Sequence, residues 1–281
     1  MTHEPTAIEV LRDSSDPAAL TKAAQELAIS KDAPSLEALR AALESPKFLD
    51  TIDPPAKPPA SRLGMKLWKI LRSLSDNPDP KARGVIDWLT KSPAYQKHIA
   101  RVDLLLEATQ EVRPPSTDVV NYWKAYTGAN DLHAPVLQRI LLVNGSPEAL
   151  AIFRGMMANG GFPPERRVNW IRAGVPRYRN DASYLAMVKS LVEDKLVAPG
   201  VRLGAVESVF DWDEEWGPIH GPNVYTPPLR ALAPKAAREE TREVAKAART
   251  GLSIPTVLDG KITAVLTQLD GLDAGEKPPG G

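Results

Sequence analysis

The sequence predicts an all-α fold built from repeated helical hairpins, and three observations support this prediction. First, residues 146–210 match themselves at an offset of 35 residues, so that Pro164 falls on Pro199 and Arg167 falls on Arg202. Second, apolar residues within each unit lie three and four positions apart, which is the spacing of one helix face. Third, prolines stand where the second helix of each unit begins, and the first turn of a helix tolerates proline. Self-similarity at this period is typical of stacked-helix arrays.

Each unit of this repeat contains two apolar stripes, one for each helix of a hairpin. The first unit carries Leu150, Phe153 and Met157, then Val168, Ile171 and Val175; the second carries Leu185, Val188 and Val192, then Leu203, Val206 and Phe210. One hairpin cannot cover both of its apolar faces, so neighbouring hairpins have to stack.

The N-terminal part has the same design. Asp16-Pro17 repeats the layout of Ser146-Pro147, in which a helix cap precedes a proline. Residues 16–30 and 34–45 are therefore expected to form a first hairpin. The proline-rich stretch 53–61 is expected to be a stiff connector, and we favour a loop over a weak domain boundary there.

The remaining chain continues the pattern, with one interruption. Helices are expected at about 63–74, 81–90, 94–112, 117–126, 135–143, 234–250 and 255–270. Residues 211–228 hold four prolines, two glycines and two tryptophans without a period, and a long irregular insertion of this kind is more often functional than a passive connection. We predict a single domain over 1–272 and a disordered tail over 273–281.

The segments Asn77–Leu89 and Ala198–Val206 resemble the start of the second helix in HEAT repeats. Both contain a proline, intervening residues, an arginine, and then small and aliphatic positions. Tetratricopeptide repeats have a similar period, but their prolines close the second helix, whereas these prolines open it. The resemblance covers about two thirds of the chain. It implies an α–α superhelix of HEAT-like hairpins with one irregular insertion near 211–228.

Composition narrows the functional classes. Lys and Arg together number 35, as do Asp and Glu, so the net charge is zero. This balance disfavours a surface built for nucleic acid or for an anionic membrane. The chain has no cysteine, which excludes disulfides and thiolate metal sites. No apolar stretch is long enough to span a membrane and no secretory signal is recognisable, so we expect a cytoplasmic protein and a monomer.

A group of arginines with interleaved aromatic residues is the first candidate binding surface. Guanidinium groups bind phosphate and carboxylate, and aromatic rings stack on bases or pack in interfaces. The members are Arg166, Arg167, Trp170, Arg172, Arg177, Tyr178 and Arg179. The alternative is structural, with Arg167 and Arg202 forming contacts within the repeat and the other arginines solvated.

An acidic group follows directly and is the second candidate. Its carboxylates are Glu207, Asp211, Asp213, Glu214 and Glu215, and Trp212 and Trp216 bracket the last of them. The spacing is similar to the start of a calcium loop, but Pro222 stands where that loop needs its bidentate glutamate. We therefore expect these carboxylates to pair with arginines or with a basic partner, and we expect no metal ion.

No complete catalytic constellation is present. The four histidines are scattered without the spacing of a zinc site, and phosphate-loop and nucleophile-elbow motifs are missing. Asp87 beside Trp88 is more simply a solvated carboxylate beside a core residue than a base-flipping pair. We assign no catalytic residue and no cofactor.

Two functions follow from these features. The first is a non-enzymatic scaffold or adaptor that binds a protein partner through its concave face and the 211–228 loop. The alternative is a DNA-binding HEAT-like enzyme of the alkylpurine DNA glycosylase type, which the neutral net charge weakens. A HEAT-like chromophore lyase is a third option without a supporting motif.

Overall fold

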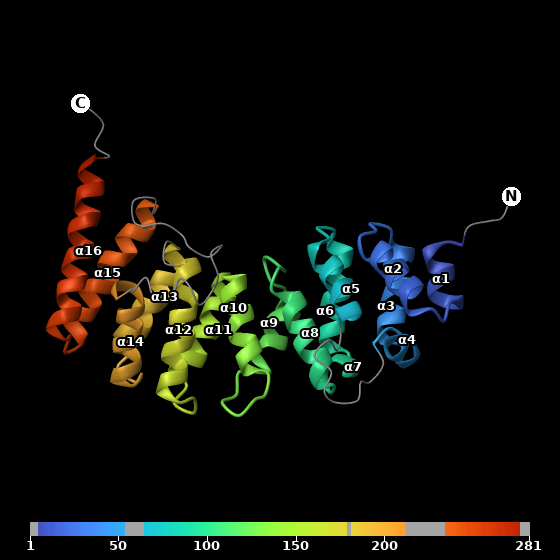
Figure 1. The fold of residues 1–281 in the computed structure, drawn as a ribbon, viewed down its shortest axis with the longest axis horizontal. Coiled ribbons are helices and arrows are strands. Elements are labelled where there is room, and N and C mark those ends of the chain that lie inside the picture. The colour runs from blue at the N-terminus through green and yellow to red at the C-terminus, as the bar shows by residue number, and fades with distance from the viewer. Residues whose placement is uncertain (1–4, 54–64, 179–180, 212–233, 276–281) are drawn as a thin grey trace. The chain divides into compact units, whose positions relative to one another are not determined.

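The computed structural model describes residues 5–53, 65–178, 181–211 and 234–275, and all regular structure within these ranges is α-helical. The predicted all-α fold is therefore confirmed (Figure 1). The chain divides into two compact units. Unit 1 comprises residues 1–127 and 131–148, and unit 2 comprises residues 128–130 and 149–281. That the whole of 1–272 forms one domain stays a prediction.

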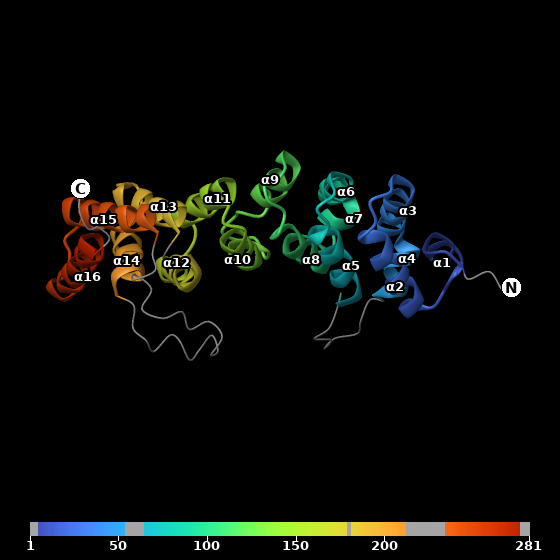
Figure 2. The same cartoon turned by 90° about the horizontal axis from the view of Figure 1, so that it is seen from above.

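Unit 1 contains two rows of helices that pack against each other. Its helices are α1 (Ala7–Asp13), α2 (Pro17–Ala28), α3 (Ala33–Glu44), α4 (Pro46–Ile52), α5 (Met65–Asp76), α6 (Pro80–Lys91), α7 (Pro93–Gln96), α8 (Ile99–Thr109), α9 (Thr117–Lys124) and α10 (Ala134–Asn144). In one row α2 contacts α5, α5 contacts α8, and α8 contacts α10. In the other row α3 contacts α6 and α6 contacts α9, as Figure 2 shows.

Unit 2 is organised in the same way. Its helices are α11, which begins at the boundary between the units (Pro147–Ala158), α12 (Pro164–Tyr178), α13 (Ala182–Glu193), α14 (Pro199–Phe210), α15 (Lys235–Gly251) and α16 (Thr256–Gly275). The helices α12, α14 and α16 contact one another in sequence, and α13 packs against α15 and α14 (Figure 2).

Most helices begin where the capping residues and prolines predict. At α2, for example, the Asp16 carboxylate accepts hydrogen bonds from the backbone N–H groups of Ala18 and Ala19 at 3.2 and 2.9 Å, and Pro17 occupies the first turn. Such a side chain satisfies N–H groups that have no partner within the helix. The first hairpin, predicted over 16–30 and 34–45, is thus observed as α2 and α3.

The helix predicted over 94–112 is wrong, because the structure has two helices there. At His98 the backbone is extended, and this separates α7 from α8. Tertiary contacts hold α7 in place: the Tyr95 ring is fully buried, and its hydroxyl donates a hydrogen bond to the carbonyl of Leu43 at 3.3 Å. These partners are distant in sequence, so local periodicity does not reveal the break.

Two further short helices, α1 and α4, were not expected. The first begins with a capping box, in which Thr6 and Glu9 bond to each other's backbone N–H groups, and this pair is recognisable in the sequence. The second begins at Ser45-Pro46, the same cap-and-proline pattern as elsewhere. Both capping patterns can be read from the sequence. The helices that follow them are too short for their apolar residues to show a helical period.

The predicted connector, insertion and tail fall largely outside the described residues. Residues 54–64 and 212–233 are not described, and α14 ends at Phe210, just before the predicted insertion. At the C-terminus α16 continues to Gly275 and so extends into the segment 273–281 predicted as a tail. The Asp273 carboxylate accepts a hydrogen bond from Arg238 of α15 at 3.0 Å, which accounts for this extension.

Two buried asparagines connect consecutive helices of one row in unit 1. The Asn77 amide donates to the carbonyls of Ala28 and Ser30 at 2.8 and 2.9 Å, at the end of α2. The Asn144 amide donates to the carbonyls of Gln110 and Val112, both at 3.0 Å, at the end of α8. The last carbonyls of a helix have no partner within it. Each asparagine stands at the end of one helix and donates hydrogen bonds to the carbonyls at the end of the preceding helix in the row.

Gly204 marks a close approach between α12 and α14. A Cβ atom at this position would lie 2.6 and 2.8 Å from the two methyl carbons of Val168. Valine is branched at Cβ and has little rotamer freedom in a helix, so the clash cannot be relieved cheaply. The absence of a side chain at this position lets the two helices pack directly.

We predict that Gly204→Ala destabilises the protein by about 1–3 kcal/mol, since overpacking a closely packed contact forces atoms to shift. Gly155→Ala on α11 is the matched control, because nothing lies within 4 Å of a Cβ atom there. The control should stabilise by about 0.5–1 kcal/mol, since alanine favours a helix over glycine. Urea denaturation of both variants measures this, and equal effects of the two changes would contradict the close approach.

Candidate functional site

Arg167 of the predicted arginine group lies inside unit 2. It is only 3% exposed, and its Nη1 donates a hydrogen bond to the carbonyl of Met157 in the last turn of α11 at 3.1 Å. Burial lowers the pKa of the guanidinium, although an arginine stays protonated at neutral pH. This side chain closes a helix end, so it does not belong to an exposed binding surface.

Arg202 makes the same contact one repeat later. Its Nε donates to the carbonyl of Val192, in the last turn of α13, at 2.7 Å. A second bond, from Nη2 to the carbonyl of Gly251 at 3.1 Å, reaches the end of α15. Arginine and acceptor are both displaced by the repeat interval of 35 residues, so the self-similarity of the sequence includes this hydrogen bond.

Arg172 also has a partner within unit 2. Its Nη2 lies 2.9 Å from a carboxylate oxygen of Glu207, which joins α12 to α14. The two side chains are 38% and 29% exposed. An ion pair in such a setting contributes little stability, but it occupies the arginine. Glu207 comes from the acidic group, so here the structure brings the two candidate groups into contact.

Arg166 is exposed and lies beside Trp170, whose side chain is largely buried. The Arg166 guanidinium lies over the Trp170 ring, 6.0 Å from its centroid. Trp170 is 8% exposed and packs edge-on against Phe162, with a centroid distance of 5.0 Å. Among the residues that the structure describes, Arg166 has no carboxylate partner. It is therefore an available cation beside an anchored aromatic ring.

The other predicted binding residues are only partly placed. Asp211 lies at the end of α14 and pairs with Lys261 of α16. Arg177 and Tyr178 belong to the last turn of α12, but their side chains lie outside the described part of the structure. Five further predicted residues also lie outside the described part of the structure: Arg179, Trp212, Asp213, Glu215 and Trp216.

Metal-binding geometry is not found in the described ranges, where no group of three or more His, Asp or Glu side chains converges. His133 has its Nδ1 2.8 Å from a carboxylate oxygen of Asp103. Its ring also packs edge-on against Tyr126 at a centroid distance of 5.1 Å. This pair connects the start of α10 to α8 and shows no third catalytic group.

Asp87 and Trp88 differ from the expected solvated carboxylate and core ring. Asp87 accepts a hydrogen bond from the Ser116 hydroxyl, which connects α6 to the cap of α9. Trp88 is half-buried rather than buried, and the Arg40 guanidinium lies 4.7 Å from its ring centroid. Both residues are thus engaged in contacts between helices of unit 1.

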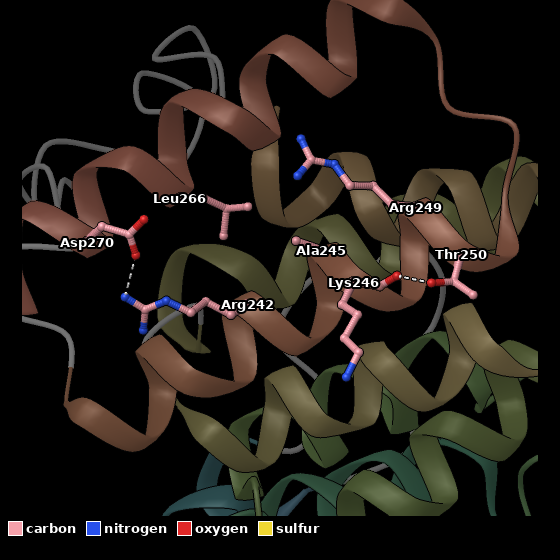
Figure 3. A pocket seen from close by; sticks show the side chains of 7 residues that line it. All are labelled: Arg242, Ala245, Lys246, Arg249, Thr250, Leu266 and Asp270. Carbon is pink, nitrogen blue, oxygen red and sulfur yellow. Dashed lines mark hydrogen bonds and ion pairs between the residues drawn. The ribbon is translucent and has the colours of Figure 1, made fainter.

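The sequence analysis missed a cleft between α15 and α16. Its volume is about 380 Å³, and Figure 3 shows the side chains that line it. The lining residues are Arg242, Ala245, Lys246, Arg249, Thr250, Leu266 and Asp270. Arg242, Lys246 and Arg249 are four and three positions apart on α15, so this stripe was visible in the sequence.

Carboxylates of α16 hold both arginines of the cleft. Arg242 Nη2 lies 3.1 Å from Asp270 and 2.5 Å from Asp273. Arg249 Nε lies 2.8 Å from Asp259, and its Nη2 donates to the Thr263 hydroxyl at 2.7 Å. These pairs hold the two guanidinium groups in defined orientations.

Comparisons with protein-family models, with curated proteins and with solved structures found no match to this chain. A separate search of the described helices found none that is both long enough and apolar enough to cross a membrane. The functional argument therefore rests on the residues themselves.

We predict that replacing the three arginines by methionine destabilises the protein in the order Arg202, Arg167, Arg166. Arg202→Met leaves the buried carbonyl of Val192 and the part-buried carbonyl of Gly251 without a donor and should cost about 2–4 kcal/mol. Arg167→Met leaves one buried carbonyl without a donor and should cost about 1–3 kcal/mol. Arg166→Met should change stability by less than about 1 kcal/mol, because the residue is exposed. Urea denaturation gives the order. A loss for Arg166→Met as large as that for Arg202→Met would contradict these roles.

The Asp194 carboxyl provides a pH-dependent prediction. The backbone N–H of Leu196 and the guanidinium of Arg154 lower its pKa. Because the folded-state pKa is depressed, the stabilisation is present above the unfolded value of about 3.9 and is lost as the pH falls through the lower, folded value. We expect NMR titration to give a pKa below the usual Asp value, and Arg154→Met to raise it. An unchanged Asp194 titration in that variant would show that the ion pair has no role.

Proposed function

We propose that this chain is a non-enzymatic, HEAT-like scaffold or adaptor that binds a protein partner as a monomer. In this proposal the hairpins form an α–α superhelix, and the partner contacts the exposed residues of α12 together with the segment 211–228. Helical arrays commonly present extended surfaces to other proteins. This extends the function expected from the sequence, with the buried arginine removed from the binding surface.

The recurrence of one buried hydrogen bond at the repeat interval is the observation that carries the proposal. Arg167 and Arg202 bond to the carbonyls of Met157 and Val192, so the repeat is a unit of three-dimensional packing as well as of sequence. The two rows of helices in each unit add support, because consecutive members of a row contact each other. Both features are typical of repeat proteins.

The contacts of the charged side chains also support a binding role. Where the structure describes them, most arginines bond to carbonyls or to carboxylates of a neighbouring helix, as Arg154 does with Asp194 at 2.6 Å. Groups used in this way are not positioned as a general acid, a general base or a nucleophile with its base. A binding role therefore accounts for the described residues better than a catalytic role.

The surface around Arg166 and Trp170 has the chemistry of a protein interface. Arginine and tryptophan are the residue types most enriched where truncation weakens protein binding. The Phe162 ring packs edge-on against the Trp170 ring and holds it in one orientation. This lowers the entropic cost of ordering the Trp170 side chain when a partner binds. Its neighbours Glu165 and Asn169 are exposed, so a partner has access to this face of α12.

The alternative function is a DNA-binding HEAT-like enzyme of the alkylpurine DNA glycosylase type. Arg166 beside an aromatic ring is the feature that fits it, since arginine and aromatic side chains can stack on bases. The zero net charge and the pairing of Arg172 with Glu207 weaken it.

We predict that Arg166→Glu abolishes specific capture of the partner while the protein remains folded. The change reverses an exposed charge at the proposed interface, and rim charges act on association. Affinity capture from nuclease-treated native lysate, followed by mass spectrometry, compares the wild type with this variant. Circular dichroism and a thermal melt confirm the fold.

Lys195→Glu is the matched control, since Lys195 is an exposed cation of unit 2 in the segment between α13 and α14 and is not part of α12. It should retain the captured protein. Equal capture by the wild type, Arg166→Glu and Lys195→Glu would count against the proposed surface. A mobility shift of DNA at low salt, weakened by Arg166→Glu, would instead favour the enzyme alternative, because binding to phosphates falls steeply with salt.

A further inference from the structure

We propose that the cleft between α15 and α16 binds an organic anion, namely a carboxylate or phosphate group joined to a short apolar chain. This site is separate from the proposed partner surface on α12 and does not depend on it. It is formed by residues of unit 2 alone.

The size of the cleft suits such a ligand. Its volume of about 380 Å³ lies at the lower end of the range for small-molecule sites. In Figure 3 Arg242 and Asp270 face each other at one end, Arg249 lies towards the other end, and Ala245 and Leu266 lie between them. A chain of a few carbon atoms can therefore contact the apolar pair while its charged group reaches a guanidinium.

The two arginines keep hydrogen-bond donors for a ligand. Both bonds of Arg242 to carboxylates are made by Nη2, and Arg249 uses Nε and Nη2. Nε and Nη1 of Arg242 and Nη1 of Arg249 thus have no acceptor among the described residues. Their side chains are 29% and 39% exposed, so solvent reaches both. A guanidinium has five N–H donors and can bind a second oxyanion beside the first.

Charge determines the sign of the ligand. The lining carries three cations and one carboxylate, which gives +3 and −1 and an excess of positive charge. An anionic group can accept hydrogen bonds from the unused guanidinium N–H groups, whereas a neutral apolar ligand would leave these donors unused. Asp259 and Asp273 bind the same guanidinium groups from outside the lining, and a Glu243 carboxylate oxygen lies 3.8 Å from Lys246 Nζ. These carboxylates reduce the attraction for an anion. Binding should therefore be weak and sensitive to salt.

The apolar part of the ligand provides the remaining selectivity. Ala245 is 1% exposed and Leu266 is half-buried. Covering the exposed part of Leu266 with a hydrocarbon chain removes apolar surface from water, which is favourable in proportion to the area. An anion with such a chain should bind better than acetate or inorganic phosphate.

NMR of the arginine side-chain N–H groups in the full chain tests this proposal directly. Sodium hexanoate, hexyl phosphate, sodium acetate and hexanol are titrated at constant ionic strength. Hexanoate or hexyl phosphate should shift the Arg242 and Arg249 Nε–H signals along a saturating curve, acetate should bind more weakly, and hexanol should have no effect. Arg154 is the internal control, because it also pairs with a carboxylate but lies outside the cleft.

A matched pair of variants tests the role of the guanidinium. Arg249→Gln should reduce the affinity for hexanoate about tenfold, as expected for losing one charged hydrogen bond. Lys195→Gln, which removes an exposed charge elsewhere in unit 2, should leave the affinity within about twofold of the wild type. A thermal melt of each variant separates loss of the ligand from loss of the fold.

A comparison of hexanoate with the blocked peptide acetyl-Leu-Glu-Leu-amide distinguishes the two sources of the same chemistry. Tighter binding of the peptide would assign the cleft to a side chain of another protein, and tighter binding of hexanoate would assign it to a small molecule. Either result supports an anion site. Shifts that never saturate, or that are equal at Arg154, would overturn the proposal, even if Arg249→Gln failed to fold.

Discussion

The structure depends on buried polar side chains that close the carbonyl ends of its helices. The last carbonyls of an α-helix have no partner within the helix, and burying them without one is costly. Asn77 and Asn144 in unit 1, and Arg167 and Arg202 in unit 2, donate to such carbonyls from a neighbouring helix. A helix end is therefore satisfied only when the neighbouring helix is in place, which makes the stacking of helices mutually dependent.

The equal numbers of acidic and basic residues reflect a second set of contacts between helices. Ion pairs connect neighbours within each unit: Arg72 with Glu111, Arg139 with Glu107, Lys91 with Asp118, Arg154 with Asp194, Arg172 with Glu207 and Arg242 with Asp270. Each exposed pair adds little stability. Together they neutralise cations that a surface for binding nucleic acid would need to leave free. The zero net charge is consistent with this structural use of the charged residues.

Two features of unit 2 remain after these structural contacts are assigned. One is the exposed Arg166, which lies over the buried and anchored Trp170 ring and which we propose as part of a protein interface. The other is the cleft in which Arg242 and Arg249 are oriented by aspartates and keep unused donors. The first is chemically suited to a broad surface and the second to a single anionic group. The two proposals are therefore independent, and each can fail without the other.

The sequence by itself determined the helical class and most helix starts, because these depend on local spacing, caps and prolines. It also raised the possibility that Arg167 and Arg202 are structural, but only tertiary structure identified their acceptors, Met157 and Val192. The break between α7 and α8 and the close approach at Gly204 depend on distant partners, Leu43 and Val168, which no local pattern contains. The cleft likewise could be identified only from the packing of α16 beside α15. A periodic pattern specifies which face of a helix is apolar. The packing of that face against a particular neighbour decides which charged side chains are used in structural contacts and which can bind a ligand or a partner.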